Sequence, residues 1–276
     1  MLTRLDTLPP GFVDTPASEL HRLLPGPALV RLPGAAPQAL FVSVLQHGNE
    51  HTGLEAVQRL LAGYGSRPLP RPLWLFIGNP DAARQGHRRL DHQPDLNRCW
   101  PGTELPASPE TRMLEEVVAA LRGEPLLASL DIHNTTGDSP HYAGVNILDD
   151  RCLQLASLFT RTVVYFTRPR GAQSQALLGL CPAITLECGR VGNDLGSAHA
   201  HDFLERCLRL ESVPERPPAP GEIDLFESVA LVQVPHGVRL RFGPGAGADL
   251  VLDPELDRLN FRELEPGTVL GEVRGG

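Results

Sequence analysis

Two short clusters of the sequence contain residue types that commonly bind a catalytic metal ion. His47 and Glu50 lie close together, and His133 follows much later in the chain. Two imidazoles and one carboxylate, with no fourth protein ligand in view, are typical of a catalytic zinc, whose open position takes water or substrate. The alternative is a helix-capping pair and a hydrogen-bonded core histidine. Taken together, the three residues predict one Zn2+ per chain and hydrolytic chemistry.

Glu187 is the candidate acid and base. It ends an otherwise apolar run, Ile184–Leu186, where a carboxylate is costly to bury unless it has a partner or a function. A glutamate beside a metal-activated water can act as a general base and then as a general acid. The alternative is a structural carboxylate that forms an ion pair with Arg190. A second carboxylate, Asp131, is equally compatible with orienting His133 and with capping a turn.

A long polar stretch, residues 79–108, contains the candidate substrate-binding residues. The planar guanidinium of Arg98 suits a substrate carboxylate, and Asn97 adds a donor beside it. Either Arg88 or Arg89 is placed to polarise a scissile carbonyl and to stabilise the oxyanion that develops from it. For any one loop arginine, a solvated surface charge is the alternative.

The elements that must position these residues alternate between strands and helices. Apolar runs predict buried strands, and helical patterns follow Thr52, begin at Pro109 and cover 194–210. The predicted strands are 39–46, 73–77, 125–132, 163–166 and 183–186. This alternation predicts an α/β fold with a largely parallel sheet and helices on both faces. His47, His133 and Glu187 would each follow the carboxyl end of a strand, which is where such sheets bind ligands.

The prolines after Val213 indicate a division of the chain. We predict a catalytic domain over 1–213, a linker over 214–220 and a small β domain over 221–276. Short apolar runs broken by Gly and Pro predict the strands of that second domain. These runs are 229–234, 238–242, 250–252 and 269–273.

The composition of the chain limits the kinds of partner that it is expected to have. The formal net charge of −8 argues against a nucleic-acid surface, and no apolar stretch approaches the ~18 residues that span a bilayer. The first residues do not resemble a signal peptide, and five unpaired cysteines suit a reducing compartment. We therefore expect a cytoplasmic protein with no nucleic-acid or membrane partner. The oligomeric state is left open, a homo-oligomer included.

Read together, the motifs resemble the succinylglutamate desuccinylase and aspartoacylase family, relatives of the zinc carboxypeptidases. The matching segments are HGNEHTG (47–53), NPDAARQGHRR (79–89), DLNRCWPG (95–102), DIHNTTG (131–137) and ITLECG (184–189). The resemblance implies a zinc-carboxypeptidase-like fold, with a mostly parallel or mixed sheet flanked by helices. It also implies a small C-terminal β unit near the mouth of the site.

The resemblance implies roles for the candidate residues as well. One zinc would be held by His47, Glu50 and His133, with Glu187 as the acid and base. Asn97 and Arg98 would bind a substrate carboxylate. Counting forward from the Asn79–Pro80 pair places the family's carbonyl-polarising arginine at Arg88, which we favour, whereas counting back from Asn97 places it nearer Arg89.

The expected activity is a zinc-dependent amidohydrolase that cleaves the amide bond of a small N-acyl amino acid. Two departures leave the acyl group and the amino acid open. The sequence after HNTTG, Asp138–Tyr142, differs from aspartoacylases, and neither Arg168 nor Arg170 has the spacing of their further carboxylate-binding arginine. The alternatives are a zinc carboxypeptidase that acts on short peptides and a non-catalytic zinc-binding relative.

Overall fold

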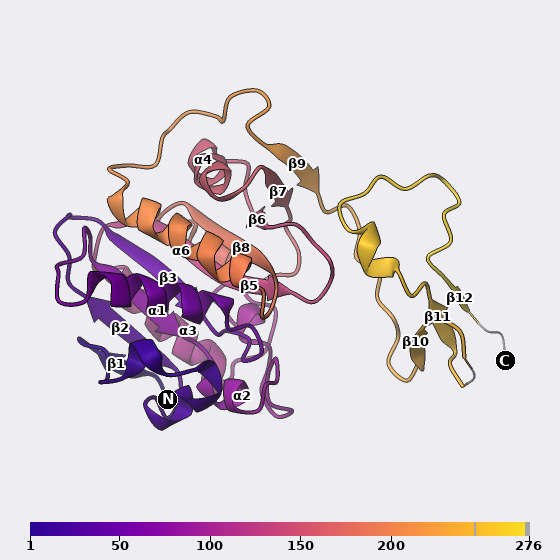
Figure 1. Ribbon diagram of the computed structural model, residues 1–276, viewed down its shortest axis with the longest axis horizontal. Coiled ribbons are helices and arrows are strands. Elements are labelled where there is room, and N and C mark those ends of the chain that lie inside the picture. The colour runs from indigo at the N-terminus through magenta and orange to yellow at the C-terminus, as the bar shows by residue number, and fades with distance from the viewer. Residues whose placement is uncertain (246, 274–276) are drawn as a thin grey trace.

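The computed structural model describes residues 1–245 and 247–273. Most of the chain forms a large mixed sheet between two layers of helices (Figure 1). Across the sheet the described strands run in the order β1-β2-β4-β3-β5-β8-β6-β7-β9. Their bounds are β1 (Thr3–Leu5), β2 (Ala28–Leu32), β3 (Ala39–Val44), β4 (Leu73–Ile77), β5 (Leu126–Thr135), β6 (Tyr142–Val145), β7 (Thr162–Tyr165), β8 (Ala183–Arg190) and β9 (Asp224–Glu227).

The centre of the sheet, β4-β3-β5-β8, is parallel, whereas β2 and β6 join it in antiparallel pairs with β4 and β8. The predicted α/β fold with a mostly parallel or mixed sheet is therefore confirmed. Because parallel strands point the same way, the carboxyl ends of β3, β5 and β8 meet at one edge of the sheet.

The helices bury both faces of this sheet. The α-helices are α1 (Thr52–Tyr64), α2 (Pro80–Arg84), α3 (Pro109–Leu121), α4 (Asp150–Phe159), α5 (Gln173–Leu177) and α6 (Asp194–Arg209). Short 3-10 helices are η1 (Phe12–Asp14), η2 (Ala17–Arg22), η3 (Leu96–Arg98) and η4 (Leu256–Leu259).

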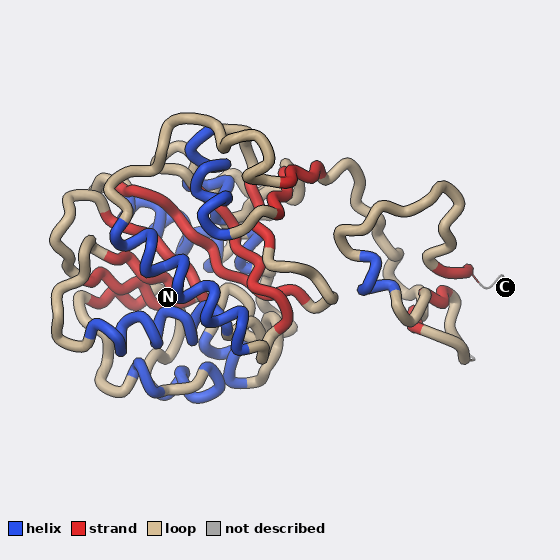
Figure 2. Tube along the Cα trace, turned by 45° about the horizontal axis from the view of Figure 1, so that its top comes forward, coloured by secondary structure: helices blue, strands red, loops and turns tan. Residues whose placement is uncertain are grey.

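Strand β3 shows how the sequence specifies these layers. All of its residues are buried, as expected for a parallel strand that is covered on both sides. Leu40 and Val42 belong to the core beneath α1, α4 and α6, whereas Phe41 packs with Trp100 and α3 on the opposite face. The alternation of side chains along the strand thus contributes to two cores. Figure 2 shows the sheet between the helices from a second direction.

Several elements differ from the sequence-based prediction. Strands β5 and β8 continue past the predicted ends, so His133 and Glu187 lie within strands instead of after them. The helix predicted to follow Thr52 includes it: α1 begins at Thr52, with His51 in the N-cap position and no side-chain capping bond. The N-terminal strands β1 and β2 were not predicted, because they are short and lie among prolines that interrupt any alternating pattern.

The C-terminal part contains a separate three-stranded sheet of β10 (Leu240–Phe242), β11 (Leu250–Leu252) and β12 (Gly271–Val273). It stands to one side of the large sheet in Figures 1 and 2. Strand β9 pairs with β7 in the large sheet, so the strands of the small sheet begin only at Leu240. The predicted run 229–234 forms no strand and is exposed. The predicted boundaries of the two domains stay a prediction.

Contacts from 256–261 tie this C-terminal part to the rest of the molecule. Asp257 forms an ion pair with Arg190, and the amide of Asn260 donates to the hydroxyl of Ser139 at 3.1 Å. The ring of Phe261 lies 5.0 Å from that of Tyr142. Among the described residues, no helix is long and apolar enough to span a membrane.

Candidate active site

The loop after β3 brings the first two predicted ligands together. Leu45 adopts a φ of 53°, a left-handed backbone that is uncommon for a branched side chain and that turns the chain out of the strand. Gly48 follows, where a Cβ would lie 2.2 Å from the backbone nitrogen of Ala83, so that no other residue fits without a shift. This tight turn directs His47 and Glu50 towards β5.

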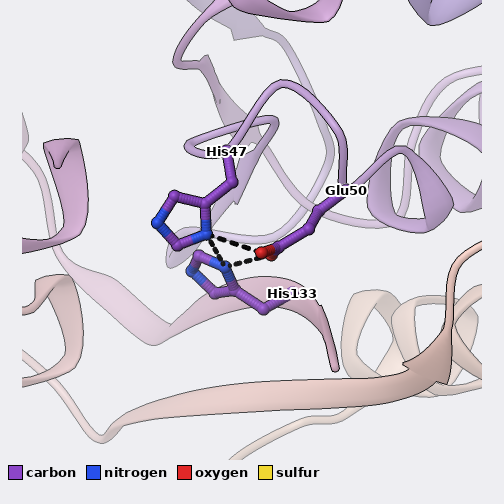
Figure 3. A group of neighbouring side chains, drawn as sticks. All are labelled: His47, Glu50 and His133. Atoms are coloured by element: carbon purple, nitrogen blue, oxygen red, sulfur yellow. Dashed lines mark hydrogen bonds and ion pairs between the residues drawn. The ribbon is translucent and has the colours of Figure 1, made fainter. Parts of the chain in front are cut away.

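His47, Glu50 and His133 converge on one point (Figure 3). Glu50 Oε1 lies 2.8 Å from Nδ1 of His47, and its Oε2 lies 2.7 Å from Nδ1 of His133. The two Nδ1 atoms are 3.1 Å apart. All three side chains are buried, with 3–5% of their surface exposed. Three ligand atoms within 4.8 Å of one another, two from imidazoles and one from a carboxylate, fit the donor set of a catalytic zinc.

A carboxylate holds the outer nitrogen of each histidine. Nε2 of His47 donates to Asp95 Oδ1 at 2.9 Å, and Nε2 of His133 donates to Asp131 Oδ2 at 2.9 Å. Partners of this kind fix the tautomer and leave Nδ1 free for a metal. Of the two interpretations of Asp131, the structure shows the contact with His133 that the orienting role requires. The contact of Asp95 was missed; its only sequence signal is an Asp that caps the turn η3, where its side chain accepts from the backbone N–H of Asn97.

The electrostatics of the cluster follow from these contacts. Burial by itself raises the pKa of Glu50, but the hydrogen bonds and charges of His133 and His47 outweigh it and hold the pKa well below its ordinary value. Burial lowers the pKa of His133, and the charges of Asp131 and Glu50 reverse this and raise it well above 6.5. Glu50 is therefore ionised at neutral pH, as a metal-ligating carboxylate must be.

The pKa of Glu187 is raised, in contrast to that of Glu50. It lies opposite His133 in the pairing of β5 with β8. Burial, reinforced by the charges of Glu50 and Asp131, raises its pKa to about 7, although His133 and Arg88 oppose the shift. Its Oε2 is buried and has no hydrogen-bond partner among the described residues. The alternative ion pair with Arg190 is not formed, because Arg190 pairs with Asp257.

The predicted arginines occupy different environments. Arg88 reaches the site, where its guanidinium lies 3.0 Å from Glu50 Oε1 and 3.0 Å from Asp95 Oδ2. Arg89 points elsewhere and donates to the backbone oxygen of Gln93. Arg98 is partly buried and forms no ion pair in the described part of the chain, although its guanidinium donates to the backbone oxygen of Asn97.

Asn97 is more enclosed than predicted. Its amide nitrogen donates to Asp131 Oδ2 at 2.9 Å, and its amide oxygen accepts from the backbone N–H of Gln173 at 3.0 Å. One N–H of the amide is left for a ligand.

One pocket of about 120 Å³ is lined by every predicted site residue: His47, Glu50, Arg88, Asn97, Arg98, His133 and Glu187. Phe166, Pro169 and Ala172, from the segment after β7, add an apolar wall, and Thr185 adds a hydroxyl. Typical small-molecule sites are about 300–1,000 Å³, so this space suits a small ligand. The pocket combines a metal-type donor set, a carboxylate with a raised pKa and two guanidinium groups.

A comparison with known protein families shows which family the chain belongs to. Residues 37–212 match the model of the succinylglutamate desuccinylase/aspartoacylase catalytic domain, which covers the pocket and all of its predicted residues. The chain belongs to this family. The succinylglutamate desuccinylase of Serratia proteamaculans is 34% identical to it over 269 residues, which are 86% of this chain and 75% of that protein.

Solved structures agree on the fold of this family member. The succinylglutamate desuccinylase structure from Vibrio parahaemolyticus is similar with a TM-score of 0.64 at 19% identity, over 89% of this chain and 76% of that one. A metallo-carboxypeptidase from Burkholderia cenocepacia is similar with a TM-score of 0.51 at 18% identity, over 65% and 60%. Membership of this family of deacylases supports a hydrolase that acts on amide bonds.

Proposed function

We propose that this chain is a zinc-dependent amidohydrolase that removes the acyl group from a small N-acyl amino acid. The observation that carries the proposal is that Glu187 shares a pocket with a cluster of two histidines and a glutamate, while its Oε2 has no hydrogen-bond partner among the described residues. Neither feature is needed for folding, since each costs free energy of desolvation.

His47, Glu50 and His133 would hold the metal through the atoms that face one another. When bound, Zn2+ supplies a Lewis acid and lowers the pKa of water towards ~7. Asp95 and Asp131 keep the two imidazoles in the tautomer that offers Nδ1.

Glu187 would move the proton. Its carboxylate takes a proton from the attacking water and later delivers that proton to the nitrogen of the leaving amine. In the metal-free protein, burial raises the pKa of Glu187 to about 7, towards the range in which a carboxyl group can both accept and release a proton near neutral pH. The free Oε2 is available for this exchange.

The arginines would bind the negative charges of substrate and oxyanion. Arg88 lies beside Glu50 at the pocket wall, where negative charge on the substrate carbonyl oxygen would develop. Arg98, which is free of ion pairs among the described residues, would bind a substrate carboxylate together with the remaining N–H of Asn97. The small pocket favours an N-acyl amino acid over a peptide. All five cysteines are unpaired, which supports the cytoplasm as the compartment.

The test is the release of free amine from N-succinyl, N-acetyl and N-formyl amino acids and from dipeptides, with and without a chelator. N-succinylglutamate is the first substrate to try, because relatives are named for its hydrolysis. We expect release from one small N-acyl amino acid that stops with chelator and returns with zinc. Release from dipeptides alone would instead identify a carboxypeptidase, and turnover that chelator does not affect would contradict the metal.

A further inference from the structure

Gln46 is a buried amide that lies directly before the metal-site histidine His47 and that the proposed reaction does not use. It is 1% exposed. Its Oε1 accepts from Nε1 of Trp100 at 2.8 Å, and its Nε2 lies 2.5 Å from Oδ1 of Asp131. An indole N–H can only donate, so Trp100 determines which end of the amide is oxygen and directs the NH2 group to the carboxylate.

Asp131, which accepts the hydrogen bond from Gln46, is fully buried, with 0% of its surface exposed. Oδ1 accepts from Gln46 and, at 2.7 Å, from the hydroxyl of Ser43. Oδ2 accepts from Asn97 and from Nε2 of His133, each at 2.9 Å. The two donors on Oδ2 also lie 2.9 Å apart, which follows from their shared acceptor and is not a bond between them. The two donors on Oδ1 therefore fix the plane of the carboxylate and the direction of Oδ2.

The direction of Asp131 Oδ2 determines which nitrogen of His133 carries its proton. With its Nε2 proton donated to Asp131, the ring has Nδ1, which lies beside Glu50, left to bind a metal. We infer that Gln46 is a positioning residue for the metal ligand His133: anchored by Trp100, it orients Asp131 and so raises the affinity of the site for its metal. The inference rests on the metal centre of the proposed function.

The test measures zinc affinity and needs no turnover. Zinc is titrated into metal-free protein against a chromophoric chelator, for wild type, Gln46→Leu and the control Gln58→Leu. Gln58 is also buried and its amide makes two hydrogen bonds, but these go to the backbone oxygens of Phe12 and Thr15, away from the site. We expect Gln46→Leu to weaken zinc binding about tenfold or more, and Gln58→Leu to change it by less than about twofold.

Trp100→Phe provides a second test that keeps an aromatic ring at this position in the core. It removes the indole N–H, so the amide of Gln46 loses the contact that sets its orientation. We expect a loss of zinc affinity of about threefold or more at an unchanged fold, judged by circular dichroism. If Gln46→Leu does not fold, the zinc affinity of Trp100→Phe tests the role of Gln46 instead.

The outcomes separate the two proposals. If wild type binds no zinc, the proposed metal centre is wrong. If wild type binds about one zinc per chain and the folded Gln46 and Trp100 variants bind it equally well, the metal centre stands and the role of Gln46 is overturned. Equal losses in Gln46→Leu and Gln58→Leu would also overturn it, because the effect would then be general destabilisation.

Discussion

Glu187 and His133 are direct neighbours across the paired strands β8 and β5. Adjacent residues in a sheet point to the same side, so the carboxylate and the imidazole face one pocket from two rigid strands. The arrangement would place the proposed proton-transfer group beside a proposed metal ligand without relying on a loop. A site on strands keeps its geometry better than a site on loops.

This relationship predicts the effect of Glu187→Gln on turnover. The amide has nearly the same shape but cannot take the proton of the attacking water, so we expect kcat to fall at least about a hundredfold. Zinc content should stay at about one per chain, because Glu187 is not in the predicted ligand set. Zinc analysis and steady-state kinetics on the same sample measure both. A fully active variant would make Glu187 a structural residue.

The raised pKa of Glu187 also predicts a pH-dependent cost in stability. The carboxyl titrates near 4.5 when unfolded and at about 7 in the folded, metal-free protein. The folded state therefore holds this proton more tightly, and the resulting stability is present below pH 4.5 and lost as pH rises through 7. At pH 8, metal-free Glu187→Gln should be more stable than wild type by on the order of 3 kcal/mol.

Urea denaturation at a series of pH values measures this difference. The advantage of the variant should shrink towards zero as the pH falls below 4.5. A difference that does not change with pH would mean that the carboxyl of Glu187 is not desolvated in the folded protein.

Much of the site could be predicted from the sequence, for a physical reason. His47 and His133 follow or end apolar runs, and an apolar run that is short for a helix and lies between turn residues favours a buried strand. Strand β4 was predicted with its observed bounds, Leu73–Ile77. Once such strands are parallel, their carboxyl ends meet, so the ligands converge without further information.

What could not be predicted depends on contacts between distant segments. Asp95 lies 48 residues from His47 in a polar loop, and no local pattern reports that it folds back onto the imidazole. The choice between Arg88 and Arg89 likewise depends on the path of the loop, since Gly48 N–H is tied to the backbone oxygen of Arg88. The pairing of β9 with β7 was missed because four exposed residues carry no burial pattern.

The two neighbouring arginines provide a matched comparison. Arg88→Ala should lower kcat by about a hundredfold, as expected when a group that stabilises the oxyanion is lost. Arg89→Ala removes the same charge one position along and should change kcat by less than about twofold. Among the described residues, the hydrogen bonds of the Arg89 side chain go to backbone oxygens of its own loop. Steady-state kinetics of both variants measure the difference. The reverse order would assign the role to Arg89.

Arg98 should act mainly on substrate binding. If its guanidinium holds a substrate carboxylate in both the ground state and the transition state, Arg98→Ala raises KM with little change in kcat. Arg98→Lys keeps the charge but loses the planar pair of donors, so an intermediate KM is expected. Kinetics on one N-acyl amino acid and on its methyl ester complete the test. An unchanged KM in the alanine variant would remove Arg98 from the substrate site.

Asp95 links the metal ligand His47 to Arg88, with one carboxylate oxygen for each. Asp95→Asn keeps the shape but removes the charge that both partners use. Burial opposes ionisation of Asp95, yet the hydrogen bond and charge of His47, with the charges of Arg88 and Arg98, keep its pKa well below the ordinary value. Wild type therefore holds this charge at any working pH. We expect the variant to bind zinc about tenfold to a hundredfold more weakly.

Chelator competition measures the affinity. The control is Asp91→Asn, a change in the same loop, whose side chain makes no contact to the site among the described residues. Equal affinities in the two variants would show that the hydrogen bond from His47 to Asp95 does not support the metal.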